Sequence, residues 1–158
     1  MSAPESTEPP RGVRIGVDVG KVRVGVALSD PGGVLATPLV TLRRDLNTEG
    51  KPVAEDIAEL VRLVVVHESV EVVVGLPVTL AGTEGPAAAE ARAYAEQLAR
   101  AVAPVPVRLS DERMSTVVAT RRLSERGVRG GRRRAVIDQA AAVEILQGWL
   151  DSRRRRDA

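Results

Sequence analysis

Three acidic residues could act together if the fold brings them to one place. Asp18 lies in the run GVRIGVDVGKVRVGVALSD, Glu112 follows a predicted strand, and Asp138 lies on a predicted helix. Grouped carboxylates repel one another, and a divalent cation bound between them relieves that repulsion. With oxygen ligands only, the expected ion is Mg²⁺ or Mn²⁺. Two such ions about 4 Å apart would stabilise the attacking and leaving oxygens of an in-line phosphoryl displacement.

The residues around Asp18 alternate with a period of two, which predicts a strand. Gly16 shares a face with Asp18, and the opposite face carries Val13, Ile15 and Val17. Gly16 and Gly20 leave space beside the carboxylate for a group as large as a phosphate. The simpler alternative is an aspartate that caps the hairpin turn.

Asp138 lies on the inward face of an amphipathic helix. At about 100° per residue it falls in the same arc as Ala141, Ala142 and Leu146. A carboxylate near a helix N-terminus gains about 0.3 to 1 kcal/mol from the helix dipole, but it gains this equally on the outer face. The inward position is costly unless a cation or a donor meets the carboxylate. The placement of Asp138 therefore favours a functional role.

Two neighbouring carboxylates, Asp111 and Glu112, follow the strand predicted over residues 105–110. Strand parity places Asp111 with Val107 and Leu109, and it places Glu112 on the other face. Both faces of a central strand are covered, so parity does not decide which carboxylate enters the site. A further alternative is a helix start, in which Asp111 or the hydroxyl residues that follow cap the next helix.

Positive charge gathers in the last third of the chain. Residues 1–107 hold 10 Lys and Arg against 14 Asp and Glu, whereas residues 108–158 hold 13 against 7. A one-sided basic surface is typical of a protein that binds a polyanion. The basic residues close to the acidic candidates would contact a phosphate backbone. They are Lys21, Arg23, Arg113, Arg132, Arg133 and Arg134.

Composition excludes several classes of site. There is no cysteine and His67 is the only histidine, so a disulfide framework, a thiolate zinc site and a histidine metal cluster are all excluded. Only Tyr94 and Trp149 are aromatic, so base stacking is not expected to dominate. The N-terminal residues lack the apolar segment of a signal peptide, and no apolar run approaches the roughly 18 residues that cross a bilayer. We expect a cytoplasmic protein without membrane contact.

Hydrophobic periodicity predicts an α/β fold, a mixed five-stranded sheet with helices on both faces in the order βββαβαβαα. Residues 12–152 are expected to form one domain, residues 1–11 a disordered tail and residues 153–158 a basic C-terminal tail. The predicted elements are strands that start at residues 13, 22 and 34, a helix over 51–67, a strand over 71–76, a helix over 85–102, a strand over 105–110, and helices over 115–127 and about 135–153.

Four separated motifs resemble the YqgF/RuvX family of RNase H-like nucleases. They are IGVDVGKVRVGVALSD at 15–30, VVVGLP at 72–77, DERMST at 111–116 and IDQAAAVEILQGWL at 137–150. The resemblance implies an RNase H-like fold, in agreement with the predicted order of elements. It also implies that Asp18, Glu112 and Asp138 form a metal-binding catalytic triad. The family acts either in processing of the 5′ end of pre-16S ribosomal RNA or in Holliday junction resolution, so the expected partner is structured RNA or branched DNA.

Two interpretations of the function stay open at this stage. The first is a metal-dependent endonuclease, and the alternative is a nucleic-acid-binding module that keeps the fold without cleaving. Acidic groups beside a phosphate path weaken binding unless a metal ion lies there, which favours the nuclease. Symmetric resolution of a junction requires two active sites and hence a dimer, whereas trimming an RNA end requires one. The oligomeric state is therefore left open.

Overall fold

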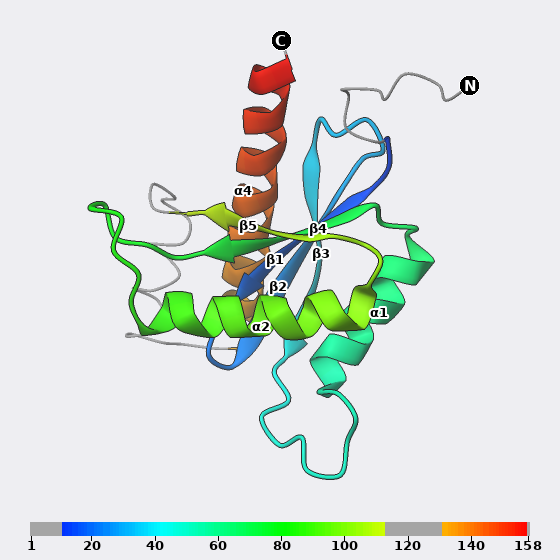
Figure 1. Cartoon of the computed structure of the whole chain (residues 1–158), viewed down its shortest axis with the longest axis vertical. Helices are drawn as coiled ribbons and strands as arrows, with labels where there is room; N and C mark the ends of the chain where they lie inside the picture. The colour runs from blue at the N-terminus through cyan, green and yellow to red at the C-terminus, as the bar shows by residue number, and fades with distance from the viewer. Residues whose placement is uncertain (1–10, 113–130, 158) are drawn as a thin grey trace.

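The structure, a computed structural model, describes residues 11–112 and 131–157, with the side chains of the second range described from residue 136 to 155. Figure 1 shows its arrangement. The elements are β1 (Arg14–Val19), β2 (Arg23–Ser29), β3 (Ala36–Arg43), α1 (Glu55–Val66), β4 (Glu71–Leu76), α2 (Pro86–Val102), β5 (Val107–Asp111) and α4 (Gly131–Asp157).

The strands form one mixed sheet in the order β3-β2-β1-β4-β5. β1, β2 and β3 are antiparallel neighbours, whereas β4 is parallel to both β1 and β5. Pro38 lies in the edge strand β3, where a missing N–H donor is tolerated. The predicted mixed five-stranded sheet is confirmed.

Helices cover both faces of the sheet. The larger core lies between the sheet and helices α1 and α2, and it includes Ile15, Val17, Val24, Val26, Val72, Val74, Ile57, Leu60 and Leu98. The second core lies under α4 and includes Ala27, Val73, Ala142, Ile145, Leu146 and Leu150. The period-two alternation of β1 and β2 sorts the valines and Ile15 into the first core. The same alternation turns the intervening positions towards α4, which lies over Gly16 and Gly25.

Two glycines allow α4 to approach the sheet closely. A Cβ on Gly16 of β1 would lie 2.6 Å from the Cβ of Leu146, and a Cβ on Gly25 of β2 would lie 2.0 Å from the backbone oxygen of Asp138. Any larger residue at Gly25 would therefore force the helix backbone away from the sheet. These glycines fix how near α4 lies to β2 at Asp138 and to β1 at Leu146.

Helix α4 is longer at both ends than the sequence indicated. It begins at Gly131, so the Arg-rich run before Asp138 belongs to the helix, and it continues through Asp157. Arginine is a good helix former, which explains the extension at the N-terminal end. At the C-terminal end, Arg153 bonds to Glu71 and thereby holds the helix on the sheet.

The helix predicted over residues 115–127 lies outside the described residues. In the ranges that the structure describes, no helix combines the length and apolar character that a membrane crossing requires.

Candidate active site

Asp18 lies near the carboxyl end of β1, with its side chain on the face of the sheet that α4 covers. Gly16 shares that face and lies under Leu146. The carboxylate is buried, since only 1% of the residue is exposed. Asp18 pairs with Gly25 of β2, and the backbone of Asp138 lies directly over that glycine. The fold thus brings the two aspartates to neighbouring positions.

Glu112 follows β5 and enters the same face. A Cβ on Gly75 of β4 would lie 2.4 Å from Glu112 Oε1, so the carboxylate lies over that glycine. Glu112 is 9% exposed, and its backbone N–H donates to the Leu76 oxygen at 3.1 Å. Asp111 is exposed and pairs with Leu76, which packs against α2 on the opposite face. Of the two neighbouring carboxylates, Glu112 is the one that shares a face with the aspartates.

Asp138 is the third buried carboxylate, with 6% of the residue exposed, and it contacts an arginine. Arg23 Nε, at the start of β2, lies 3.5 Å from Asp138 Oδ2. The sequence predicted that Arg23 would contact a phosphate backbone. In this structure its guanidinium instead neutralises part of the charge that three buried carboxylates place in one region.

The donor set fits a hard divalent cation in type. Three carboxylates from β1, the end of β5 and α4 supply only oxygen ligands, which Mg²⁺ and Mn²⁺ prefer. Across residues 11–112 and 131–157, no three Asp, Glu, His or Cys side chains lie close enough together to hold one ion. Asp138 forms an ion pair with Arg23. Joint binding of one ion by all three carboxylates would require their side chains to move closer together.

The structure describes only some of the residues predicted to bind phosphate. Lys21 is exposed in the turn between β1 and β2, beside Asp18 in sequence. Arg113 lies outside the described residues. Arg132, Arg133 and Arg134 lie in the first turns of α4, six to four residues before Asp138, and their side chains also lie outside the described set.

Comparison with protein families gives a match over most of the chain. The family described as "RuvX: Holliday junction resolvase" matches residues 12–152. The chain belongs to the RuvX family. This membership confirms the resemblance that the four sequence motifs indicated.

Relatives of this RuvX-family chain are found in Rhodococcus, Mycobacterium and Frankia. A protein of Rhodococcus erythropolis is 57% identical over 152 residues, which cover 96% of this chain and 85% of the relative. A protein of Mycobacterium sp. (strain KMS) is 58% identical over 151 residues, covering 96% and 86%. A protein of Frankia casuarinae is 59% identical over 142 residues, covering 90% and 68%. All three bear the name of a candidate pre-16S rRNA nuclease.

A solved structure supports the fold of the RuvX-family chain. RuvC of T. thermophilus, determined in complex with a Holliday junction substrate, superposes with a TM-score of 0.53 at 16% identity. The match covers 90% of this chain and 95% of RuvC. At this identity the likeness concerns the fold alone, and it confirms the RNase H-like architecture.

Arg44 anchors the turn next to Asp18, a role that the sequence analysis missed. Its Nη1 donates to the Gly20 oxygen at 3.2 Å and forms an ion pair with Glu90 of α2. Its guanidinium lies 5.5 Å from the centre of the Tyr94 ring. Glu90 and Tyr94 are four residues apart and so share a helix face. That spacing was the one feature of the sequence that could have indicated a shared partner for these two side chains. The β1–β2 turn of this RuvX-family chain is thereby tied to α2.

Tyr94 is held in turn by a buried carboxylate. Its hydroxyl donates to Asp56 Oδ2 at 2.7 Å, and the backbone N–H of Asp45 donates to Asp56 Oδ1 at 3.1 Å. Burial raises the pKa of the Tyr94 phenol, and the hydrogen bond and charge of Asp56 raise it further. The phenol therefore stays protonated and holds α2 against the start of α1.

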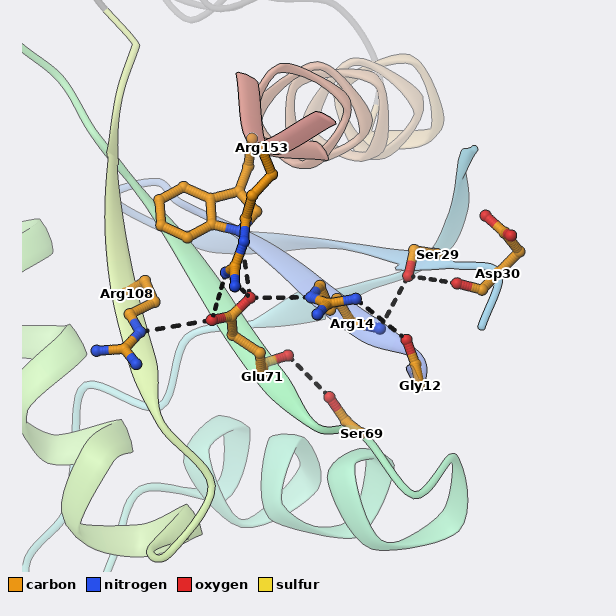
Figure 2. A network of polar contacts seen from close by, with 9 residues as sticks. Gly12, Arg14, Ser29, Asp30, Ser69, Glu71, Arg108 and Arg153 are labelled. Carbon is orange, nitrogen blue, oxygen red and sulfur yellow. Dashed lines mark hydrogen bonds and ion pairs between the residues drawn. The ribbon is translucent and has the colours of Figure 1, made fainter. Parts of the chain in front are cut away.

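A second buried network lies at the opposite end of β1 and β4 from Asp18 (Figure 2). Glu71, the first residue of β4, is 5% exposed. Four side chains donate to its carboxylate: Arg14 Nε at 2.9 Å, Trp149 Nε1 at 3.2 Å, Arg153 Nη1 at 3.2 and 3.1 Å, and Arg108 Nε at 3.4 Å. The network joins β1, β4, β5 and α4 at a single carboxylate.

The charge state of Glu71 follows from these partners. Burial by itself would raise the pKa of the carboxyl, but the Arg14 hydrogen bond and the charges of Arg153 and Arg14 outweigh it and lower the pKa below its usual value. Glu71 is therefore ionised at neutral pH. The sequence signal was an ionisable residue at the head of an otherwise apolar strand.

Proposed function

We propose that this RuvX-family chain is a metal-dependent nuclease that hydrolyses phosphodiester bonds in structured nucleic acid. The observation that carries the proposal is the burial of Asp18, Glu112 and Asp138, from three separate elements, on one face of the sheet. Three buried carboxylates in one region are costly without a cation. The family description and the names borne by the relatives support the same reaction class.

The three carboxylates would hold Mg²⁺ or Mn²⁺. When bound, such an ion activates water and stabilises the charge that develops on the phosphate. The chain itself buries the three carboxylates on the face of the sheet that α4 covers, and it places the Arg23 guanidinium beside Asp138. Hydrolysis adds water across the bond between phosphorus and the 3′ oxygen, leaving a 5′-phosphate and a 3′-hydroxyl.

The remaining basic residues would bind the substrate backbone. Lys21 lies in the exposed turn beside Asp18. We assign phosphate contacts to Lys21 and Arg113, and to Arg23 when its guanidinium leaves the contact with Asp138. The same role is proposed for Arg132, Arg133 and Arg134. Contacts of this kind position the nucleic acid without reading its sequence.

The protein is expected to act in the cytoplasm.

A non-catalytic nucleic-acid-binding module is the second candidate. The contact between Arg23 and Asp138 favours it, because this pair satisfies one carboxylate without a metal ion. Basic charge supports both functions equally, since phosphate contacts supply most of the affinity for nucleic acid. Burial of three carboxylates beside a phosphate path favours the nuclease, because a pure binding module gains nothing from them.

Parallel cleavage assays separate these functions and the two substrates. An end-labelled four-way DNA junction and an RNA stem with a 5′ extension are incubated with the chain in Mg²⁺, in Mn²⁺ or in EDTA. We expect cleavage of at least one substrate with either metal, no cleavage in EDTA, and none by Asp18→Asn. If wild-type protein binds both substrates and cuts neither, the binding module is the correct function. Cleavage by Asp18→Asn at the wild-type rate would place the reaction outside the three carboxylates.

A further inference from the structure

The edge strand β5 carries a basic residue on the same face as Glu112. Arg108, Ser110 and Glu112 alternate along this strand, and Arg108 and Ser110 pair with Val73 and Gly75 of β4. Helix α4 packs on β1, β2, β3 and, less extensively, β4. Among the described elements, none covers the Arg108 side chain, 54% of which is exposed. This face of β5 therefore lies beside α4 and open to a ligand.

The Arg108 guanidinium contacts a buried carboxylate through one nitrogen. Its Nε lies 3.4 Å from Glu71 Oε2, and Glu71 is the only side chain to which Arg108 bonds within the described parts of the chain. Figure 2 shows both terminal nitrogen atoms of Arg108 directed away from Glu71. A planar guanidinium that contacts a carboxylate through Nε keeps its two terminal nitrogens for a second partner, as a fork that matches a phosphate.

The charge around Glu71 also favours an additional anion. One carboxylate accepts hydrogen bonds from three guanidinium groups, those of Arg14, Arg108 and Arg153. This leaves an excess of positive charge at one end of the sheet, which attracts an anion. Arg14 is 5% exposed and the Arg153 side chain 29%, so Arg108 is the member that reaches solvent most fully.

The spacing along β5 relates this arginine to the candidate active site. Arg108 lies four positions before Glu112, which corresponds to about 13 Å at ~3.3 Å per residue. A helical strand rises ~3.4 Å along its axis per nucleotide and also rotates, so at most about four nucleotides span that distance. We propose that Arg108 binds a backbone phosphate of the substrate strand within about four nucleotides of the scissile bond. This inference rests on the proposed function, because it takes the carboxylates as the cleavage point.

Binding measurements in the non-cleaving Asp18→Asn background test the inference. The probes are a fluorescent four-way DNA junction and a fluorescent RNA stem with a 5′ extension. For whichever probe the Asp18→Asn parent binds, Arg108→Ala is expected to weaken binding about tenfold and to reduce the slope of log K against log salt by about one. Arg108→Lys keeps the charge, so it should keep the slope while losing part of the affinity that the fork provides. Arg62→Ala is the matched control, because Arg62 is exposed on α1 and also bonds to a single glutamate, Glu59.

A scan of neutral phosphates locates the contact. Single methylphosphonates are placed one to six nucleotides on each side of the cleavage point. One position, within about four nucleotides of the cleavage point, should weaken binding by the Arg108 parent and have no effect on Arg108→Ala. Equal effects of every methylphosphonate on both proteins, or an unchanged affinity and salt slope for Arg108→Ala, would overturn the inference. Either result leaves metal-dependent cleavage by wild-type protein intact, so the two proposals fail separately. A parent that binds neither probe would overturn both.

Discussion

Glu112→Gln is expected to reduce the rate of phosphodiester cleavage by about a thousandfold or more. The substitution keeps the size of the side chain and its position over Gly75, but it removes one of three negative charges that would hold the metal ion. A bound metal supplies several kcal/mol of transition-state stabilisation, and ~4 kcal/mol corresponds to about a thousandfold in rate. The measurement is single-turnover cleavage of the substrate that wild-type protein cuts.

Asp111→Asn provides a matched control one residue away. Asp111 is exposed and lies on the opposite face of β5 from Glu112. Its neutralisation makes the same change of charge and should leave the cleavage rate within about twofold of wild type. The reverse pattern, with Asp111→Asn inactive and Glu112→Gln active, would show that the active-site carboxylate is Asp111 and that the assignment of Glu112 is wrong.

Glu71→Gln is expected to lower the free energy of unfolding at pH 7 by about 3 to 5 kcal/mol. The amide cannot neutralise Arg14, which is 5% exposed and would be left as a buried charge. The substitution would also weaken the hydrogen bonds from Trp149 and Arg153 to residue 71, which hold α4 against the sheet. Urea unfolding measures the loss. Glu96→Gln, on the exposed face of α2, is the control and should change stability by less than about 0.5 kcal/mol.

The Glu71 contribution should depend on pH in a defined direction. Its pKa is lowered in the folded state, so the unfolded chain takes up a proton first as the pH falls. The stabilisation is therefore complete above the unfolded pKa of about 4.3 and is lost as the pH falls below that value towards the folded pKa. The stability difference between wild type and Glu71→Gln should shrink between pH 7 and about pH 3.5. A difference that stays constant over this range would show that charge is not its origin.

The parts of the fold that follow a simple period could be predicted from the sequence. Period-two alternation placed Asp18 opposite the core valines, and a helical period placed Asp138 on the inward face of α4, where both are buried. The order of strands and helices followed from the same patterns. Each of these predictions depends only on neighbours in the sequence.

Features that depend on tertiary neighbours could not be predicted. The choice between Asp111 and Glu112 required knowledge of which face of β5 lies on the α4 side of the sheet and which packs against α2. The contact between Arg23 and Asp138 joins residues 115 positions apart. The Glu71 network draws on four elements, and no local period marks its arginines as its partners. Long-range ion pairs of this kind leave only a weak signal in a single sequence.

Metal binding by the folded chain tests the central claim most directly, because it requires neither the substrate nor catalysis. Mn²⁺ is titrated into wild-type protein and Asp18→Asn, and free Mn²⁺ is followed by electron paramagnetic resonance, with circular dichroism confirming that both chains are folded. Wild-type protein is expected to bind Mn²⁺, and Asp18→Asn to bind it at least about tenfold more weakly, because a ligand is lost. Equal Mn²⁺ affinity of the two folded proteins would contradict the assignment of the buried carboxylates as the metal site.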